Sequence, residues 1–203
     1  MSSAIRWHYI VGDIHGCLDE LLALEAKAAR HAARHGARPR FVSVGDLVDR
    51  GPNSAGVVAR FREGAKAGTH AAILGNHEQS LLRALAEHAP ALLAPHGGLP
   101  ARAGESLASM HHRGSHPLAR HLPWAEFRTY ARLNWLGQGG GETLASWGAD
   151  PWHPATWRIP DEDLAFLCGL PLLWENEAVV VTHALARADE LDLVRARERG
   201  AVV

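Results

Sequence analysis

Three short apolar segments recur early in the chain, and each is followed by a glycine, a polar residue and then a helical pattern. The segments cover residues 7–11, 41–44 and 71–74. Runs of this length rich in valine and isoleucine are typical of buried strands, and leucines that recur every three or four residues are typical of amphipathic helices. That spacing predicts helices over about 18–34, over a stretch that contains Phe61, and over about 78–87. Three successive strand-loop-helix units predict an α/β fold built in layers.

The pattern weakens between residues 90 and 132, where alanine, proline, glycine and histidine mix without a clear strand. We interpret 90–132 as a variable insertion within a single domain that covers residues 1–203. Beyond it, the sequence predicts a glycine turn at 139–141, a helix at about 161–168, and a hairpin around the polar turn 175–177.

Composition excludes several classes of function. The chain is 47% hydrophobic and 21% charged, as in ordinary globular proteins and unlike disordered chains. A formal net charge of -1 supplies no positive field for a nucleic acid or an anionic membrane. No apolar run approaches the roughly 20 residues that span a bilayer. Since the N-terminus also lacks the pattern of a secretion signal, we expect a cytoplasmic location and neither nucleic acid nor membrane as a partner.

Potential metal ligands follow the predicted strands. The loops are GDIHG at 12–16, GDLVDRG at 45–51, GNHE at 75–78 and THA at 182–184. In α/β folds such loops gather beyond the carboxyl ends of the strands. Their donors are Asp13, His15, Asp46, Asn76 and His183. This mixed oxygen and nitrogen set suits manganese, iron or zinc better than calcium. Two ions about 3.5 to 4 Å apart would activate water and polarise a phosphoryl group, with Asp46 as the candidate shared ligand.

The same loops hold three residues suited to the rest of a phosphoester hydrolysis. A departing alkoxide needs a proton, and His77 oriented by a carboxylate such as Asp49 is a competent general acid near neutral pH. Arg50 adjoins Asp49, and its guanidinium can donate to two phosphate oxygens.

In this order, the loops GDIHG, GDLVDRG and GNHE resemble those of the phosphoprotein phosphatase branch of the calcineurin-like metallophosphoesterases. Residues 135–148 and 170–184 also resemble bacterial members related to the phage-type serine/threonine protein phosphatases. The resemblance implies a layered metallophosphoesterase-type β-sandwich flanked by helices and shortened at the C-terminus.

The resemblance implies a metal-binding role for five residues. Asp13 and His15 would hold the first ion, Asn76 and His183 the second, and Asp46 both. The expected ions are Mn²⁺, with iron or zinc as alternatives. Members of the family usually supply one more histidine from further strands, whereas no histidine follows His183 here. We therefore expect the C-terminal strands of the family to be absent, and the second ion to use water, another residue or a weakened site.

The resemblance also implies the residues that handle the substrate. His77 and Asp49 become the general acid pair, Arg50 binds phosphate, and Arg197 supplies a further phosphate-binding arginine. The family usually has tryptophan where Arg195 stands, which weakens the alignment at Arg197.

The favoured function is that of a phosphoserine/phosphothreonine protein phosphatase that attacks phosphorus with a hydroxide bridging two metal ions; its substrate would be a phosphorylated protein or a small phosphoester. One alternative is a symmetrical bis(5'-nucleosyl)-tetraphosphatase, whose family usually carries aspartate where Glu78 stands. Another is a truncated phosphatase-like protein with weak or no activity. Other histidines, His70 among them, lie outside the strand-end loops, and we expect surface or structural roles for them.

Overall fold

The computed structural model describes residues 5–103, 129, 132–184 and 188–198. Its main sheet has three parallel strands in the order β1-β2-β3. The strands are β1 (Arg6–Val11), β2 (Arg38–Ser43) and β3 (His70–Ala72). The register places Phe41 between Tyr9 and His70. All three predicted strands are confirmed, although β3 ends two residues earlier than expected.

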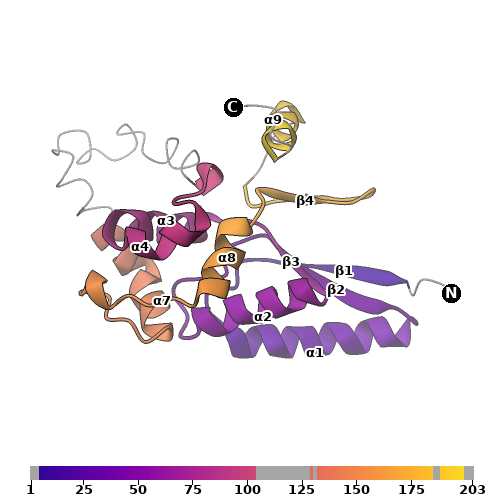
Figure 1. The fold of residues 1–203 in the computed structure, drawn as a ribbon. Helices are drawn as coiled ribbons and strands as arrows, with labels where there is room; N and C mark the ends of the chain where they lie inside the picture. The colour runs from indigo at the N-terminus through magenta and orange to yellow at the C-terminus, as the bar shows by residue number, and fades with distance from the viewer. Residues whose placement is uncertain (1–4, 104–128, 130–131, 185–187, 199–203) are drawn as a thin grey trace.

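A helix follows each strand, as the leucine spacing predicts. The helices are α1 (Leu18–Arg34), α2 (Ser54–Lys66) and α3 (Asn76–His88). Helix α1 buries Leu21, Ala28 and Ala32 on one face, and the side chain of Asn53 caps α2 by accepting a hydrogen bond from the backbone N–H of Gly56 at 2.8 Å. Helices α1 and α2 cover one face of the sheet (Figure 1).

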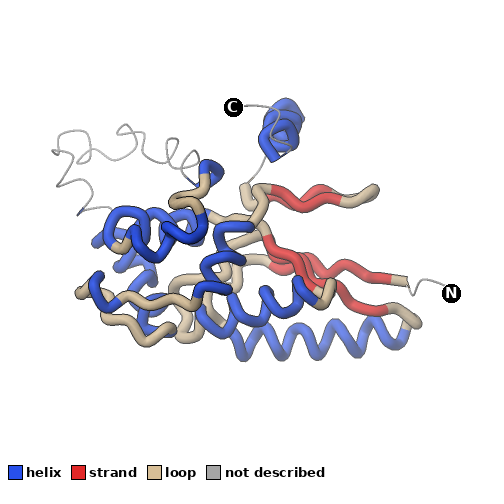
Figure 2. The backbone as a smooth tube through the Cα atoms, in the orientation of Figure 1, coloured by secondary structure: helices blue, strands red, loops and turns tan. Residues whose placement is uncertain are grey.

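A hairpin lies on the other side of the sheet (Figure 2). It pairs β4 (Leu173–Glu175) with β5 (Val180–Thr182) in antiparallel fashion, which confirms the predicted hairpin. Val181 of β5 forms a small buried cluster with Val42 and Ile73. The arrangement is therefore helices, parallel sheet and hairpin, in agreement with the layered α/β expectation.

The remaining elements within the described ranges are helical. They are α4 (Pro90–Leu93), η1 (Ala94–His96), η2 (Leu136–Gly140), α7 (Gly141–Ser146), η3 (Pro154–Thr156), α8 (Asp161–Gly169) and α9 (Ala188–Glu198). The expected glycine turn at 139–141 is wrong in part, because η2 continues directly into α7 and only Gly139, with φ 108°, departs from helical geometry. Of the predicted insertion, residues 90–96 are helical, whereas 104–128 and 130–131 lie outside the described residues.

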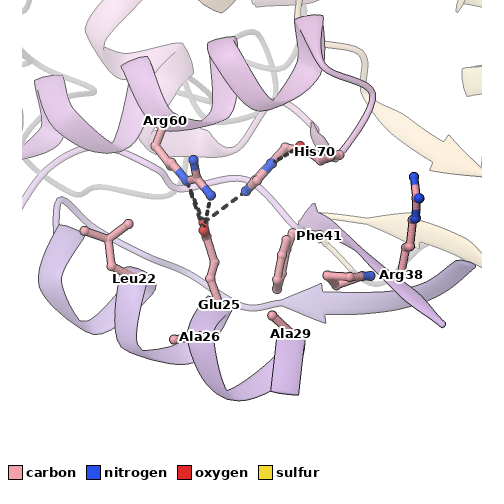
Figure 3. A pocket seen from close by; sticks show the side chains of 10 residues that line it. Leu22, Glu25, Ala26, Ala29, Arg38, Phe41, Arg60 and His70 are labelled. Carbon is pink, nitrogen blue, oxygen red and sulfur yellow. Dashed lines mark hydrogen bonds and ion pairs between the residues drawn. The ribbon is translucent and has the colours of Figure 1, made fainter. Parts of the chain in front are cut away.

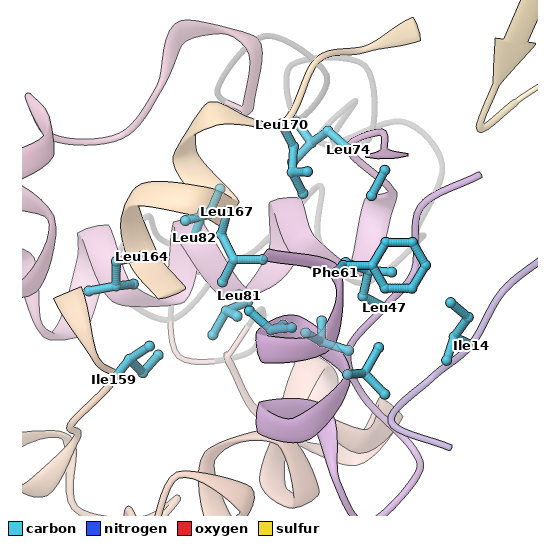
Figure 4. Close-up of a cluster of buried hydrophobic side chains, with 14 of the residues drawn as sticks. Ile14, Leu47, Phe61, Leu74, Leu81, Leu82, Ile159, Leu164, Leu167 and Leu170 are labelled. Atoms are coloured by element: carbon cyan, nitrogen blue, oxygen red, sulfur yellow. The ribbon is translucent and has the colours of Figure 1, made fainter. Parts of the chain in front are cut away.

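The main core joins the second half of the chain to the first (Figure 4). Leu164 and Leu167 of α8 are fully buried in one cluster with Phe61 of α2 and with Leu81 and Leu82 of α3. Helix α8 therefore packs into the same core as α2 and α3. Across the described ranges, no helix combines the length and the apolar character needed to cross a membrane.

Candidate active site

The loops after β1 and β2 are conformationally strained. Among the residues that the structure describes, positive φ angles outside glycine occur at His15 (47°), Asp46 (52°), Asp49 (72°) and Arg50 (67°). Such a backbone costs roughly 1–2 kcal/mol per residue with an L side chain, and it persists only where neighbouring groups enforce it. Here the backbone N–H groups of Ile14 and His15 donate to the Asp46 carbonyl at 3.0 and 2.9 Å. The strain coincides with the loops that carry the predicted chemistry.

The five predicted metal ligands lie around the carboxylate of Asp46. The Nε2 atom of His15 is 3.8 Å from Oδ2 of both Asp13 and Asp46. The Nε2 atom of His183 is 3.5 Å from Oδ1 of Asp46 and 2.7 Å from Oδ1 of Asn76. Asp46 thus places one carboxylate oxygen beside each histidine.

The tautomers of the two histidines are set by backbone carbonyls. Nδ1 of His15 donates to the Val48 carbonyl at 2.9 Å, and Nδ1 of His183 donates to the Val44 carbonyl at 2.8 Å. The Nε2 lone pair of His15 then faces the carboxylates of Asp13 and Asp46, and that of His183 faces the oxygens of Asn76 and Asp46. Nε2 of His15 is buried and has no hydrogen-bond partner, which is costly unless a cation occupies the site. The donor set therefore fits a divalent ion.

Two groups of potential ligands share Asp46. One combines it with His15 and His77, the other with Asp13 and His183, and within each group the ligand atoms lie within 4.8 Å of one another. This grouping differs from the predicted division, which pairs Asp13 with His15 and gives His77 no metal. The carboxylate that the two groups share is the arrangement that a pair of neighbouring ions requires.

His77 forms a short hydrogen bond with a buried carboxylate. Its Nδ1 donates to Oδ2 of Asp49 at 2.6 Å, and Asp49 is fully buried. Burial disfavours the charged imidazole, but the hydrogen bond and the negative charge of Asp49 outweigh burial and raise the pKa of His77. Nη2 of Arg50 lies 3.4 Å from Nε2 of His77, so the guanidinium and the proton-carrying edge of the imidazole face the same space.

Sequence reasoning missed the structural role of Glu78. Its two carboxylate oxygens accept hydrogen bonds from the backbone N–H groups of Asp46 (2.8 Å), Leu47 (2.7 Å), Val48 (3.2 Å) and Gly75 (2.9 Å). Burial and the nearby charge of Asp46 raise the pKa of Glu78 to about 7, against the opposing effect of these amides. A glutamate three residues after a helix N-cap is a capping signal that could have indicated this role.

Trp135 and Thr143 were also missed as partners of the acid pair. The indole Nε1 of Trp135 donates to Oδ2 of Asp49 at 2.9 Å, and the hydroxyl of Thr143 donates to Oδ1 at 2.7 Å. The separation along the chain explains why local patterns could not reveal these contacts. For the predicted phosphate ligand Arg197, the backbone lies in α9 but the side chain is outside the described residues.

Comparisons with known proteins agree with this arrangement. The family model for calcineurin-like phosphoesterases matches residues 9–194. The chain is similar to serine/threonine-protein phosphatase 1 of Salmonella typhimurium, at 41% identity over 46% of this chain and 39% of that protein. It is also similar to symmetrical bis(5'-nucleosyl)-tetraphosphatases of Shewanella oneidensis (41% identity) and Shewanella baltica (43% identity), each over 37% of this chain and 25% of the relative.

These matches span less than half the length of each relative. The family match, in contrast, covers almost the whole of the chain that contains the sheet, the strand-end loops and the hairpin. The chain belongs to the calcineurin-like phosphoesterase family.

Proposed function

We propose that this chain hydrolyses phosphoesters with two divalent ions, preferably Mn²⁺, held by the cluster around Asp46. The observation that carries the proposal is the buried, unpartnered Nε2 of His15, which faces a carboxylate shared by two ligand groups. Asp13 and His15 would hold one ion, and Asn76 and His183 the other. When bound, such ions supply positive charge on the phosphoryl oxygens and lower the pKa of water to near neutrality.

The residues beside the cluster complete the reaction. Arg50 would bind phosphate oxygens that gain charge in the transition state. His77 would protonate the leaving oxygen from Nε2, since Nδ1 is held by Asp49. The raised pKa of His77 keeps this proton available near neutral pH. No covalent phosphoenzyme is needed, because the nucleophile is water.

We propose phosphoserine and phosphothreonine side chains of proteins as substrates. This choice is supported by the similarity to the Salmonella phosphatase, which extends over 93 residues, against 75 and 76 residues for the two Shewanella tetraphosphatases. The similarity of this chain to the two tetraphosphatases, at 41% and 43% identity, makes symmetrical dinucleoside tetraphosphates the second candidate substrate. A phosphopeptide and diadenosine tetraphosphate, assayed in parallel, separate the two. The cytoplasm remains the predicted location.

The experiment is hydrolysis of an aryl phosphate by chelator-stripped protein, with and without Mn²⁺. Asp46→Asn and His77→Ala are measured in parallel, and circular dichroism establishes that both variants are folded. Turnover that requires the ion and is lost in both variants supports the proposal. A folded wild-type chain that hydrolyses no phosphoester with any divalent ion contradicts the proposal. That result would instead support the alternative of a phosphatase-like protein without activity.

A further inference from the structure

Residues 135–143 lie against the general acid pair although they come from a distant part of the chain. This stretch, the positioning segment, contains Trp135, η2 and the start of α7. It belongs to the stretch 135–148, whose resemblance to bacterial phosphatases was noted above and to which the proposed reaction assigns no role. Two of its side chains, Trp135 and Thr143, are buried and end on the carboxylate of Asp49.

The hydroxyl of Thr143 makes two hydrogen bonds to one residue. It donates to Oδ1 of Asp49 at 2.7 Å and accepts from the backbone N–H of Asp49 at 2.7 Å. The hydroxyl therefore links the backbone of Asp49, which has φ 72°, to its own carboxylate and fixes the side-chain rotamer. Ser54 supports the contact from α2, with its Oγ 3.1 Å from the Thr143 oxygen.

Trp135 holds the other carboxylate oxygen. Oδ2 of Asp49 accepts from both the Trp135 indole (2.9 Å) and His77 Nδ1 (2.6 Å), so the carboxylate has three side-chain donors in a fixed arrangement. A carboxylate held by three donors can rotate only by breaking a buried hydrogen bond, which costs about 1–3 kcal/mol.

Two consecutive glycines let the segment approach this closely. A Cβ on Gly139 would lie 2.0 Å from the backbone nitrogen of Arg50, and a Cβ on Gly140 would lie 2.3 Å from the indole ring of Trp135. Gly139 also has φ 108°. The glycine pair thus allows direct packing of η2 on the strained Asp49-Arg50 turn and of the indole against η2.

We propose that Trp135 and Thr143 are positioning residues that orient Asp49, and through it the proton-donating Nε2 of His77. The inference rests on the proposed function, because it assigns these residues to the general acid of that reaction. Misplacing a catalytic group by about 1 Å can cost on the order of 100-fold in rate. The loss should grow with the need of the leaving group for a proton.

The kinetic experiment compares two substrates with each variant. We expect Trp135→Phe and Thr143→Val to lower kcat/KM for phenyl phosphate about tenfold, and for 4-nitrophenyl phosphate at most about twofold, because nitrophenolate leaves without a proton. Thr143→Ser should restore the ratio of the two rates. In a His77→Ala background, Trp135→Phe should not change that ratio further. Equal losses on both substrates would overturn the proposal in favour of a purely structural role.

Trp157→Phe is the matched control, since the Trp157 indole donates to the Asp150 carbonyl and its ring packs 6.3 Å from that of Trp135. We expect it to leave the substrate ratio unchanged.

A second measurement does not depend on activity. The Nδ1–H proton of His77, assigned by its absence from His77→Ala, should shift or broaden in the NMR spectra of Trp135→Phe and Thr143→Val but not of Trp157→Phe. An unchanged signal in both positioning variants would overturn the inference. If the signal changes while the wild type hydrolyses no substrate, the proposed function fails and the positioning of the pair stands.

Discussion

Among the residues that the structure describes, two buried histidines are hydrogen-bonded to a buried carboxylate, and the two pairs differ in backbone conformation and in the groups around them. In the candidate active site, His77 donates to Asp49. Behind the sheet, His70 lies 3.0 Å from Glu25, which also accepts from Nε of Arg60 at 2.9 Å (Figure 3). Both pairs are buried and both have an arginine nearby.

The two pairs differ in backbone conformation and in whether a polar atom nearby lacks a hydrogen-bond partner. His70 uses both ring nitrogens, since Thr69 bonds Nδ1 at 2.9 Å, and Glu25 lies in a regular helix. A pocket of about 490 Å³ opens beside Glu25, and its lining includes the apolar Leu22 and Phe41. In the other pair His77 also lies in a helix, but its partner Asp49 belongs to a strained loop, and the unpartnered Nε2 of His15 lies nearby. A buried histidine-carboxylate pair therefore indicates function only where backbone strain and a polar atom without a hydrogen-bond partner accompany it.

The largest predicted effect tests this distinction directly. We expect His77→Ala to lower kcat for phenyl phosphate by about 10²- to 10⁴-fold, the usual contribution of a general acid. His70→Ala should change kcat less than about threefold, but should lower the free energy of unfolding by about 1–3 kcal/mol through the lost buried hydrogen bonds. Steady-state kinetics and urea unfolding of both variants measure the two quantities.

The comparison fails if the two variants exchange their behaviour. A His70→Ala protein that is stable but inactive would place the second pair in the reaction, and a fully active His77→Ala protein would remove the first pair from it.

A smaller effect is expected from two glycines that both have a positive φ angle. Gly139→Ala would force a Cβ into the backbone of Arg50, so we expect kcat/KM to fall about 10- to 100-fold as the active-site turn shifts. Gly148 also has a positive φ of 74°, but a Cβ there meets nothing within 4 Å. Gly148→Ala should therefore cost only about 1–2 kcal/mol of stability with unchanged kinetics. Similar kinetic losses in both variants would show that close packing on Arg50 is unimportant.

A contrast between local patterns and long-range contacts explains which features of the molecule the sequence could predict. Strands, helices and the ligands at strand ends can be predicted from the order of neighbouring residues. An apolar run followed by Gly45 and Asp46, for example, indicates both where the strand ends and which ligand follows it. A surface or structural role was also predicted for His70, because it lies outside the strand-end loops, and the structure shows it buried with both ring nitrogens hydrogen-bonded, although its carboxylate partner Glu25 was not predicted.

The contacts that orient the site are long-range, and the sequence did not indicate them. Asp49 is 94 positions from Thr143 and 86 positions from Trp135. The glycine pair at Gly139 and Gly140 suggested a turn because glycine is usually a turn residue, whereas here it permits close approach within a helical segment. Packing partners of this kind follow from the tertiary structure alone.

The two arginines provide the next test. Arg50→Lys keeps the charge but loses the planar fork, so we expect kcat/KM for aryl phosphates to fall about tenfold, mainly through KM. Arg60→Lys makes the same chemical change beside Glu25 and should leave both constants unchanged. An equal KM effect in the two variants would indicate general electrostatics rather than a phosphate contact at Arg50.

The smallest predicted effect concerns stability and pH at the second pair. Burial alone would raise the pKa of Glu25, but the hydrogen bonds from His70 and Arg60 outweigh it and lower the pKa from its ordinary value of 4.5. A carboxylate with a depressed folded-state pKa stabilises the protein above its unfolded-state pKa, and this stability is lost as the pH falls through the folded-state pKa.

Glu25→Gln removes this titration and leaves all other groups in place. We expect the wild type to exceed the variant by about 1 kcal/mol near pH 7, since Arg60 is partly exposed and its pairing is screened by solvent. The difference should shrink below pH 4.5, where the unfolded chain begins to bind the proton first. Urea unfolding of both proteins from pH 7 to pH 3 measures it. The kinetics of the variant at pH 7 should match those of the wild type, because the pair stands apart from the reaction. A stability difference that stays constant from pH 7 to pH 3 would mean that Glu25 contributes through packing rather than charge.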